Sequence, residues 1–265
     1  MSKFIIKPQN IRKTILKMAY FGSSAHIGCA MSLVEIYSVL YENFINYPEG
    51  NLNHPDRDYL ILSKGHGVMA QYACMYEQGW LKEDTIVNYF SDGSLLKGLS
   101  DSRVEGLEVS SGSLGHGLSV ACGISYGLKK NSSSSKVFCI LGDGEVNEGV
   151  IWEAFLFAAH HRLNNLTIII DCNGFQALGK TNEILSLGNL KLKLKSFGLN
   201  ISTVDGHNKN KIKNSIYKIL KNKKSPNALL ARTIKGKGVP FMENNNKWHY
   251  MRLNLKTYKK ALRFL

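Results

Sequence analysis

Acidic residues, cysteine and proline are all scarce in this sequence. Its 265 residues contain 20 Asp and Glu against 34 Lys and Arg, with only five cysteines and five prolines. The cysteines are odd in number and form no C-x-x-C pair, which argues against a disulfide framework or a zinc cluster and indicates a reducing compartment. No segment is long and apolar enough to span a membrane or to form the core of a signal peptide. We therefore expect a cytoplasmic protein with no membrane contact.

The excess of basic residues, a formal net charge of +14, raises the question of nucleic-acid binding. Much of this charge lies between positions 209 and 224, where seven lysines are interspersed with Ile212, Ile216 and Ile219. Such spacing is typical of an amphipathic helix whose basic face lies in solvent. We expect this helix rather than a nucleic-acid patch, and no nucleic-acid partner.

The order of apolar segments predicts an α/β fold. Hydrophobic residues make up 44% of the chain, enough for one large domain over residues 1–265. Short runs predict strands at 59–62, 136–141, 166–171, 200–205 and 227–233, and those at 136–141 and 166–171 are almost uniformly apolar. Helical patterns lie before, between and after them, the last one at 255–265. Because apolar strands alternate with helices, we expect a doubly wound, mostly parallel sheet with helices on both faces.

Local signals predict where the first two helices begin. Asn10 is a candidate N-cap for a helix that ends near Tyr20. Ser32 and Glu35 have the spacing of a capping box ahead of a second helix. Both assignments rest on short-range hydrogen bonds alone.

The most informative positions lie at the ends of two predicted strands. Asp143 stands in "GDG" after the strand at 136–141, and Asn173 stands in "DCNG" after the strand at 166–171. Ligands bind beyond the carboxyl ends of parallel strands, so both side chains should face one site. A carboxylate, an amide oxygen and a backbone carbonyl suit Mg²⁺ bound to phosphate. The helix that starts near Asn147 would favour phosphate there.

A nicotinamide-dependent dehydrogenase would also use a parallel sheet and a glycine turn. It needs G-x-G-x-x-G directly after the first strand and an acidic residue at the end of the next one. The glycine-rich "GHGLSVACG" does not follow a strand of that kind. The motif therefore does not support this alternative.

Around Asp143 and Asn173 the sequence resembles transketolases. The stretch "GDGEVNEGVIWEAF…NNLTIIIDCNGFQALG" is similar to their thiamine diphosphate motif, which begins Gly-Asp-Gly and ends in Asn. Further family landmarks appear in the same order over nearly the whole chain: "SSAHIGCAMS", "RDYLILSKGHG", "GLEVSSGSLGHGLS", "VDGHN" and "KGKGVPFMENNNKWH". The chain looks like the N-terminal subunit of a split transketolase, and 1-deoxyxylulose-5-phosphate synthase is less similar.

The resemblance implies a cofactor, thiamine diphosphate, with Mg²⁺ or, in its place, Ca²⁺ or Mn²⁺. The metal ligands would be Asp143, Asn173 and the backbone carbonyl of Phe175. The expected cofactor contacts are His66, Gly112, Leu114, Gly142, Asp143, Gly144, Asn173, Phe175 and His249. The expected catalytic positions are His26, on the substrate side, and the interface glutamates Glu148 and Glu153. Taken singly, the histidines could be structural, and a glutamate in a first helical turn could merely face the helix dipole.

The resemblance also implies a partner. In transketolases the cofactor lies between a pyrophosphate domain, which this chain resembles, and a pyrimidine domain, which supplies the glutamate that drives ylid formation. We expect the second domain on a separate chain, in a heterotetramer built around a homodimer-like core. The complex would transfer a two-carbon ketol or acyl unit from a ketose or keto donor to an aldehyde, and this chain alone would be inactive. An inactive cofactor-binding relic is the alternative.

One departure from the family pattern concerns the sugar substrate. Transketolases carry a histidine just upstream of the segment that reads "GLEV" here, but no histidine lies between His66 and His116. Leu99 or Ser100 takes its place. With one hydrogen-bonding group fewer, the site would suit a non-standard donor, for example in an acyloin-forming or branched-sugar-forming enzyme.

Overall fold

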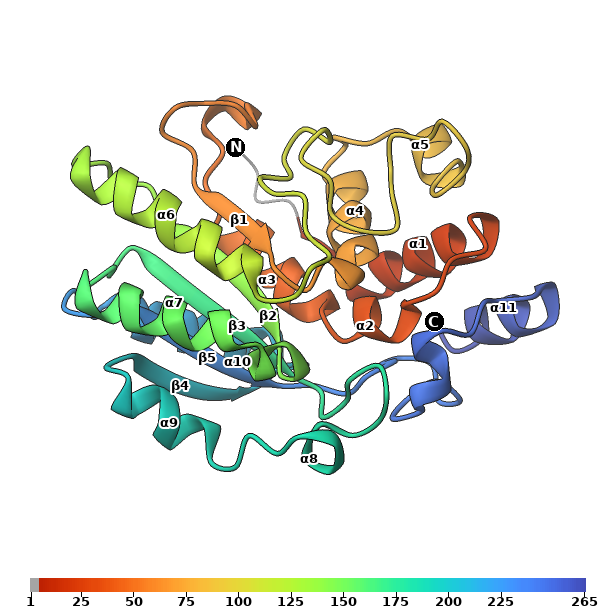
Figure 1. Cartoon of the computed structure of the whole chain (residues 1–265). Helices are drawn as coiled ribbons and strands as arrows, with labels where there is room; N and C mark the ends of the chain where they lie inside the picture. The colour runs from red at the N-terminus through yellow and green to blue at the C-terminus, as the bar shows by residue number, and fades with distance from the viewer. Residues whose placement is uncertain (1–4) are drawn as a thin grey trace.

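The computed structural model describes residues 5–265, which contain one five-stranded sheet (Figure 1). The strands lie in the order β1-β2-β3-β5-β4, and every neighbouring pair is parallel. Their bounds are β1 (Tyr59–Leu62), β2 (Val137–Gly142), β3 (Leu166–Cys172), β4 (Asn200–Asp205) and β5 (Asn227–Arg232). Each predicted strand is present to within a residue at either end, and the α/β prediction is confirmed.

Helices cover both faces of the sheet, as a doubly wound fold requires. Because side chains alternate along a strand, neighbouring residues of β2 enter different cores. Phe138 and Ile140 join the buried cluster formed with α1 (Pro8–Phe21), α3 (Val34–Asn43), α4 (Val68–Glu77) and α10 (Lys209–Leu220). Cys139 and Leu141 join the cluster formed with α6 (His116–Lys130), α7 (Gly149–His160) and α9 (Leu190–Ser196).

Shorter helices complete the described chain. They are α2 (Ile27–Met31), α5 (Glu83–Val87), α8 (Thr181–Ile184) and α11 (Leu255–Leu262), with single 3₁₀ turns η1 (Pro48–Gly50), η2 (Gly65–Gly67), η3 (Gly144–Asn147) and η4 (Asn246–His249). The lysine-rich segment is helical as predicted, with Ile212, Ile216 and Ile219 buried. Within residues 5–265, every helix is too short or too polar to cross a membrane.

Both predicted helix caps are wrong. Asn10 lies inside α1, which begins two residues earlier at Pro8. Proline is favoured in the first turn of a helix, because the N–H that it lacks would have no partner within the helix there. Ser32 does not cap α3, which begins at Val34. Its hydroxyl instead donates a hydrogen bond of 2.6 Å to Asp171, 139 residues away in the chain. Spacing along the sequence could not reveal such a partner.

The strand register places the ends of β2 and β3 side by side. Gly142 of β2 pairs with Asp171 of β3. Asp143 and Asn173 therefore follow directly at the same carboxyl edge of the sheet, as the sequence predicts. The next turns of the chain build a cavity at this edge.

Candidate functional site

A cavity of about 490 Å³ opens at the carboxyl edge of the sheet. Its wall comes from the turns after β1, β2 and β3 and from segments near both ends of the chain. Ten of the twelve predicted site residues line it: His26, His66, Leu114, Gly142, Asp143, Gly144, Glu148, Asn173, Phe175 and His249. Gly112 lies instead in an adjoining groove beside Leu99, and Glu153 lies on the exposed side of α7.

The two side chains predicted to bind metal are oriented by backbone amides. The oxygens of Asp143 accept hydrogen bonds from the N–H groups of Gly144 (2.9 Å) and Gly174 (2.8 Å). The oxygen of Asn173 accepts one from the N–H of Phe175 at 3.0 Å. Carboxylate and amide oxygens have more than one lone pair, so each can still bind a cation.

The electrostatics of Asp143 fit a bound cation. Burial, together with the nearby carboxylate of Asp171, raises the pKa of Asp143 to about 6. A raised carboxyl pKa means that the protein does not fully compensate the ionised form. A divalent cation would supply that compensation. Among residues 5–265, no group of three or more His, Cys, Asp and Glu side chains offers a different metal cage.

Glycine at position 144 lets the backbone approach the cavity closely. A Cβ atom there would lie 2.7 Å from Cγ of Gln176, nearer than packed carbon atoms come. A larger residue would therefore push the turn after β2 away from the segment after β3.

Three histidines gather in the wall of the same cavity. The ring centre of His26 lies 4.6 Å from that of His66 and 5.0 Å from that of His249. Burial, with nearby positive groups, lowers the pKa of His26 to about 4 and that of His249 to about 3. Burial also lowers the pKa of His66. All three are neutral at pH 7, so they act through hydrogen bonds rather than as cations.

The backbone at His26 is strained. Its φ angle of 65° is left-handed, a conformation that residues with a Cβ rarely adopt. The N–H of His26 donates to the carbonyl of His249 at 2.9 Å, which ties the N-terminal segment to the C-terminal one. Strain of this kind is typical of residues held for function.

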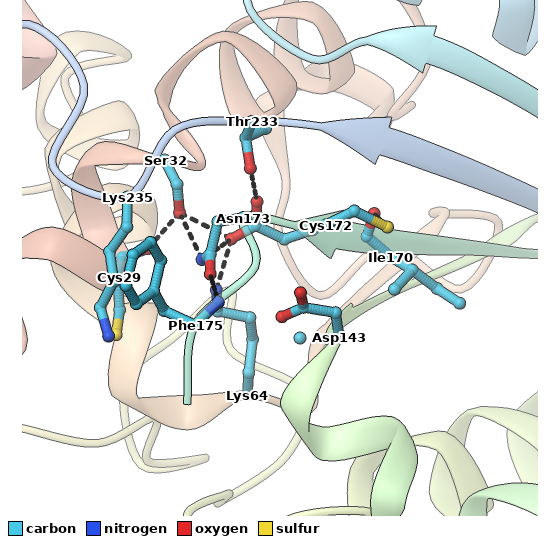
Figure 2. Close-up of polar contacts among 12 residues, drawn as sticks. Cys29, Ser32, Lys64, Asp143, Ile170, Cys172, Asn173, Phe175, Thr233 and Lys235 are labelled. Atoms are coloured by element: carbon cyan, nitrogen blue, oxygen red, sulfur yellow. Dashed lines mark hydrogen bonds and ion pairs between the residues drawn. The ribbon is translucent and has the colours of Figure 1, made fainter. Parts of the chain in front are cut away.

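Sequence reasoning misses four buried charged residues around the cavity. Lys64, which Figure 2 labels, forms an ion pair with Asp171 at 2.6 Å, and the two side chains are only 8% and 0% exposed. Lys235 is buried and donates to His249 at 2.9 Å. The fourth, Glu145, is described below. The sequence features that could have revealed these residues were weak. Asp171 is a single acidic residue at the end of an apolar strand, and Lys64 and Lys235 lie within motifs shared with transketolases.

Glu145 joins three elements beneath the cavity. Its carboxylate accepts hydrogen bonds from the hydroxyl of Ser63 (2.5 Å), the N–H of Gly115 (2.8 Å) and the N–H of Gly142 (3.0 Å). These groups lie after β1, before α6 and at the end of β2. Burial raises the pKa of Glu145 despite these donors. The residue therefore supports the site from behind.

Leu99 and Ser100, the two candidates for the position of the missing histidine, have different surroundings. Ser100 is buried, and its hydroxyl donates to the carbonyl of Val109 at 2.8 Å. Leu99 is 37% exposed and lines a second cavity of about 420 Å³, whose wall also includes His26 and His66. An apolar side chain therefore faces the histidines at this point.

One known family matches almost the entire described chain. The family described as "Transketolase, thiamine diphosphate binding domain" matches residues 9–263. The chain belongs to this family. A solved transketolase from Campylobacter jejuni shares the fold, with a TM-score of 0.89 and 27% identity over 97% of this chain and 42% of its own. The predicted transketolase resemblance and thiamine diphosphate-binding fold are confirmed.

Two similar members of this transketolase family are subunits. The chain is 37% identical to one named subunit of the apulose-4-phosphate transketolase of Actinobacillus succinogenes, over 90% of this chain and 87% of that protein. It is 34% identical to a 6-deoxy-6-sulfo-D-fructose transketolase subunit of a Clostridium species, over 95% and 92%. By contrast, it spans only 36% of mouse transketolase-like protein 2. The family places the chain in a transferase of the transketolase type.

Proposed function

We propose that this chain is the diphosphate- and metal-binding subunit of a two-subunit transketolase-like enzyme. The enzyme transfers a two-carbon ketol or acyl unit from a ketose or keto donor to an aldehyde acceptor. The observation that carries the proposal is the meeting of Asp143, Asn173 and three neutral histidines in one cavity. Similarity to proteins named as transketolase subunits supports the division into two chains.

In this proposal the residues of the chain bind and orient. Asp143, Asn173 and the backbone carbonyl of Phe175 hold Mg²⁺, for which Ca²⁺ or Mn²⁺ can substitute. His66 and His249 donate N–H hydrogen bonds to diphosphate oxygens. Thiamine diphosphate, when bound, supplies an electron sink for a carbanion.

His26 is placed to move a proton of the substrate. With a pKa of about 4, its ring has an unprotonated nitrogen at pH 7 that can accept a proton from a substrate hydroxyl. Glu148, the N-cap residue of α7, lines the same cavity, whereas Glu153 lies outside it. We assign both glutamates to contact with a partner chain. That partner, in a heterotetramer, supplies the remaining wall and the glutamate that activates the cofactor.

The donor in this proposal is an anionic sugar with altered hydroxyl recognition. Lys97 and Arg252 line the cavity that also holds Leu99, and no acidic side chain of the described chain lines it. The names of the two similar subunits refer to apulose-4-phosphate and 6-deoxy-6-sulfo-D-fructose, which both carry an anionic group. Because Leu99 cannot hydrogen-bond a donor hydroxyl, ordinary ketose phosphates should be poor donors.

Calorimetric titration of thiamine diphosphate with Mg²⁺ tests the assignment. The chain is titrated alone and together with a pyrimidine-domain protein encoded nearby. We expect weak binding alone and tight binding with the partner, because each chain supplies one wall. Absence of binding in both states would contradict the cofactor-binding role. Tight binding without turnover in the complex would favour the inactive relic, and full turnover by the purified chain alone would contradict the two-subunit arrangement.

A further inference from the structure

Asp171 is a fully buried charged side chain at the end of an apolar strand. Four side chains donate to its carboxylate, and Figure 2 labels each of them: Ser32, Lys64, Asn173 and Thr233. Oδ2 accepts from the ammonium of Lys64 at 2.6 Å, the hydroxyl of Ser32 at 2.6 Å and the side-chain amide of Asn173 at 3.1 Å. Oδ1 accepts from the hydroxyl of Thr233. The two oxygens of one carboxylate therefore have separate sets of partners.

These contacts fix the side-chain amide of Asn173 from both ends. Its nitrogen donates to Asp171, and its oxygen accepts from the N–H of Phe175 at 3.0 Å. A rotation of the amide by 180° would place its oxygen against the carboxylate and its NH₂ group against another N–H. The two orientations have nearly the same shape, so packing alone does not select between them. Hydrogen bonding does.

We propose that Asp171 is a positioning residue for the metal site: it holds the nitrogen of Asn173, so that the oxygen is the atom offered to a divalent cation. The inference rests on the proposed function, which makes Asn173 a cation ligand. An NH₂ group turned toward the site would not bind a hard cation, which takes oxygen ligands. Substitution of a residue that hydrogen-bonds a metal ligand commonly lowers the metal affinity by about 10–100-fold.

A purely structural role for Asp171 makes a different prediction. In that case the carboxylate serves only to compensate the buried charge of Lys64. Loss of any one of its hydrogen bonds would then lower the stability of the fold and the metal affinity together. The contacts separate the two roles, because Asn173 meets Oδ2 whereas Thr233 meets Oδ1. Thr233→Val removes a donor to the carboxylate without releasing the amide of Asn173.

The test compares Asp171→Leu with Thr233→Val in the full chain. Leucine has nearly the shape of aspartate but no acceptor for the amide of Asn173, whereas asparagine would keep one. Free Mn²⁺ is followed by electron paramagnetic resonance during titration in the presence of thiamine diphosphate. We expect Asp171→Leu to bind Mn²⁺ about 10–100-fold more weakly than the wild type, and Thr233→Val to stay within roughly threefold of it. The NMR signals of the Asn173 side-chain NH₂ in the cofactor-free chain should report a strong hydrogen bond in the wild type and in Thr233→Val, but not in Asp171→Leu.

Two results would overturn the inference: wild-type Mn²⁺ affinity in Asp171→Leu, or an equal loss in both variants. If Asp171→Leu does not fold because Lys64 has lost its counter-charge, the comparison moves to Lys64→Met against Lys64→Met/Asp171→Leu. The double variant should then bind Mn²⁺ at least about tenfold more weakly than the single one. If the wild type itself binds no Mn²⁺, the proposed function fails, while the amide signals of the cofactor-free chain still decide the orientation.

Discussion

At the residue scale, the site depends on which atoms of its neutral side chains donate and which accept. The ammonium of Lys235 donates to Nδ1 of His249 (2.9 Å), to the side-chain oxygen of Asn246 (2.7 Å) and to the carbonyl of Gln176 (3.3 Å). These bonds use its three protons. Neutral His249 therefore accepts at Nδ1 and carries its proton on Nε2, where it can donate to a ligand.

Substitution of Lys235 should disturb this tautomer. In Lys235→Met the strong donor to Nδ1 is lost and only the weak thiol donor of Cys29, at 3.7 Å, remains. The two neutral tautomers of His249 will therefore mix, and the affinity for thiamine diphosphate should fall about tenfold. Imidazole ¹⁵N shifts measure the tautomer, and titration measures the affinity. Lys237→Met is the matched control, because Lys237 pairs only with Glu243 at the surface. Unchanged ¹⁵N shifts in Lys235→Met would contradict the assignment.

Leu99 should limit which donors react. Leu99→His restores a hydrogen-bonding group beside His26 and His66, and one such bond is worth about 1 kcal/mol. With the partner subunit present, kcat/KM for ordinary ketose phosphates should rise roughly fivefold. Leu99→Met keeps the site apolar and should change little. Equal rates for the two variants would show that Leu99 does not set the donor.

At the element scale, helices far apart in the chain meet through a buried polar cluster. Glu35 of α3 accepts from Arg12 of α1 at 2.8 Å and from His207, which precedes α10, at 2.9 Å. Nε2 of His207 accepts from the N–H of Ile234 at 2.8 Å, so its proton lies on Nδ1, facing Glu35. Burial alone would raise the pKa of Glu35, but His207 and Arg12 outweigh it and lower that pKa.

Loss of this cluster should destabilise the fold. Glu35→Gln leaves Arg12 buried without a counter-charge and should lower the free energy of unfolding by about 3 kcal/mol at pH 7. Urea denaturation measures the change. Glu183→Gln is the control, because its pair with Lys180 is more than half exposed and should contribute under about 0.5 kcal/mol.

The contribution of Glu35 should also depend on pH. Because its folded pKa lies below the ordinary value of 4.5, the ionised group stabilises the fold above that value. The stabilisation is lost as the pH falls through the lower, folded value. The difference in unfolding free energy between wild type and Glu35→Gln should therefore shrink below pH 4.5. A difference that is the same at pH 7 and at pH 3 would contradict this account.

At the scale of the whole molecule, the cavity joins the two ends of the chain. Its wall includes His26 near the start and His249 near the end, on either side of the strand ends. A ligand held there contacts segments that must come apart when the chain unfolds. Binding should therefore stabilise the complete fold and not a single element.

Cofactor and metal together should raise the thermal stability of the chain. At about 100 times Kd, thiamine diphosphate with Mg²⁺ should add roughly 2.7 kcal/mol to the free energy of unfolding. Calorimetry should show a higher Tm that EDTA reverses. Asp143→Ala removes the charged metal ligand and should show no rise. A rise that persists in EDTA would mean that the cofactor binds without the metal.

The sequence was informative where structure is local. Short runs rich in apolar and β-branched residues identify all five strands, and the glycine turns after two of them locate Asp143 and Asn173 at one edge. The cap assignment at Ser32 failed because a tertiary partner competes with local ones, as its bond to β3 shows. The assignment at Asn10 failed for a local reason, since Pro8 already begins the helix. The landmark motifs located ten of the twelve predicted residues in the wall of one cavity.

The sequence by itself determined the fold class, the family and the two side chains that directly follow β2 and β3. Hydrophobic periodicity and turn-forming residues depend on neighbouring positions in the chain, so they can be recognised without the structure. Only the tertiary structure decided how those side chains are oriented. The bond between Lys64 and Asp171 joins residues 107 positions apart, and that between Lys235 and His249 depends on burial that no local pattern shows. Charged groups inside a protein take their partners from whatever elements packing brings together, so the polar network beneath the site becomes visible only in the folded chain.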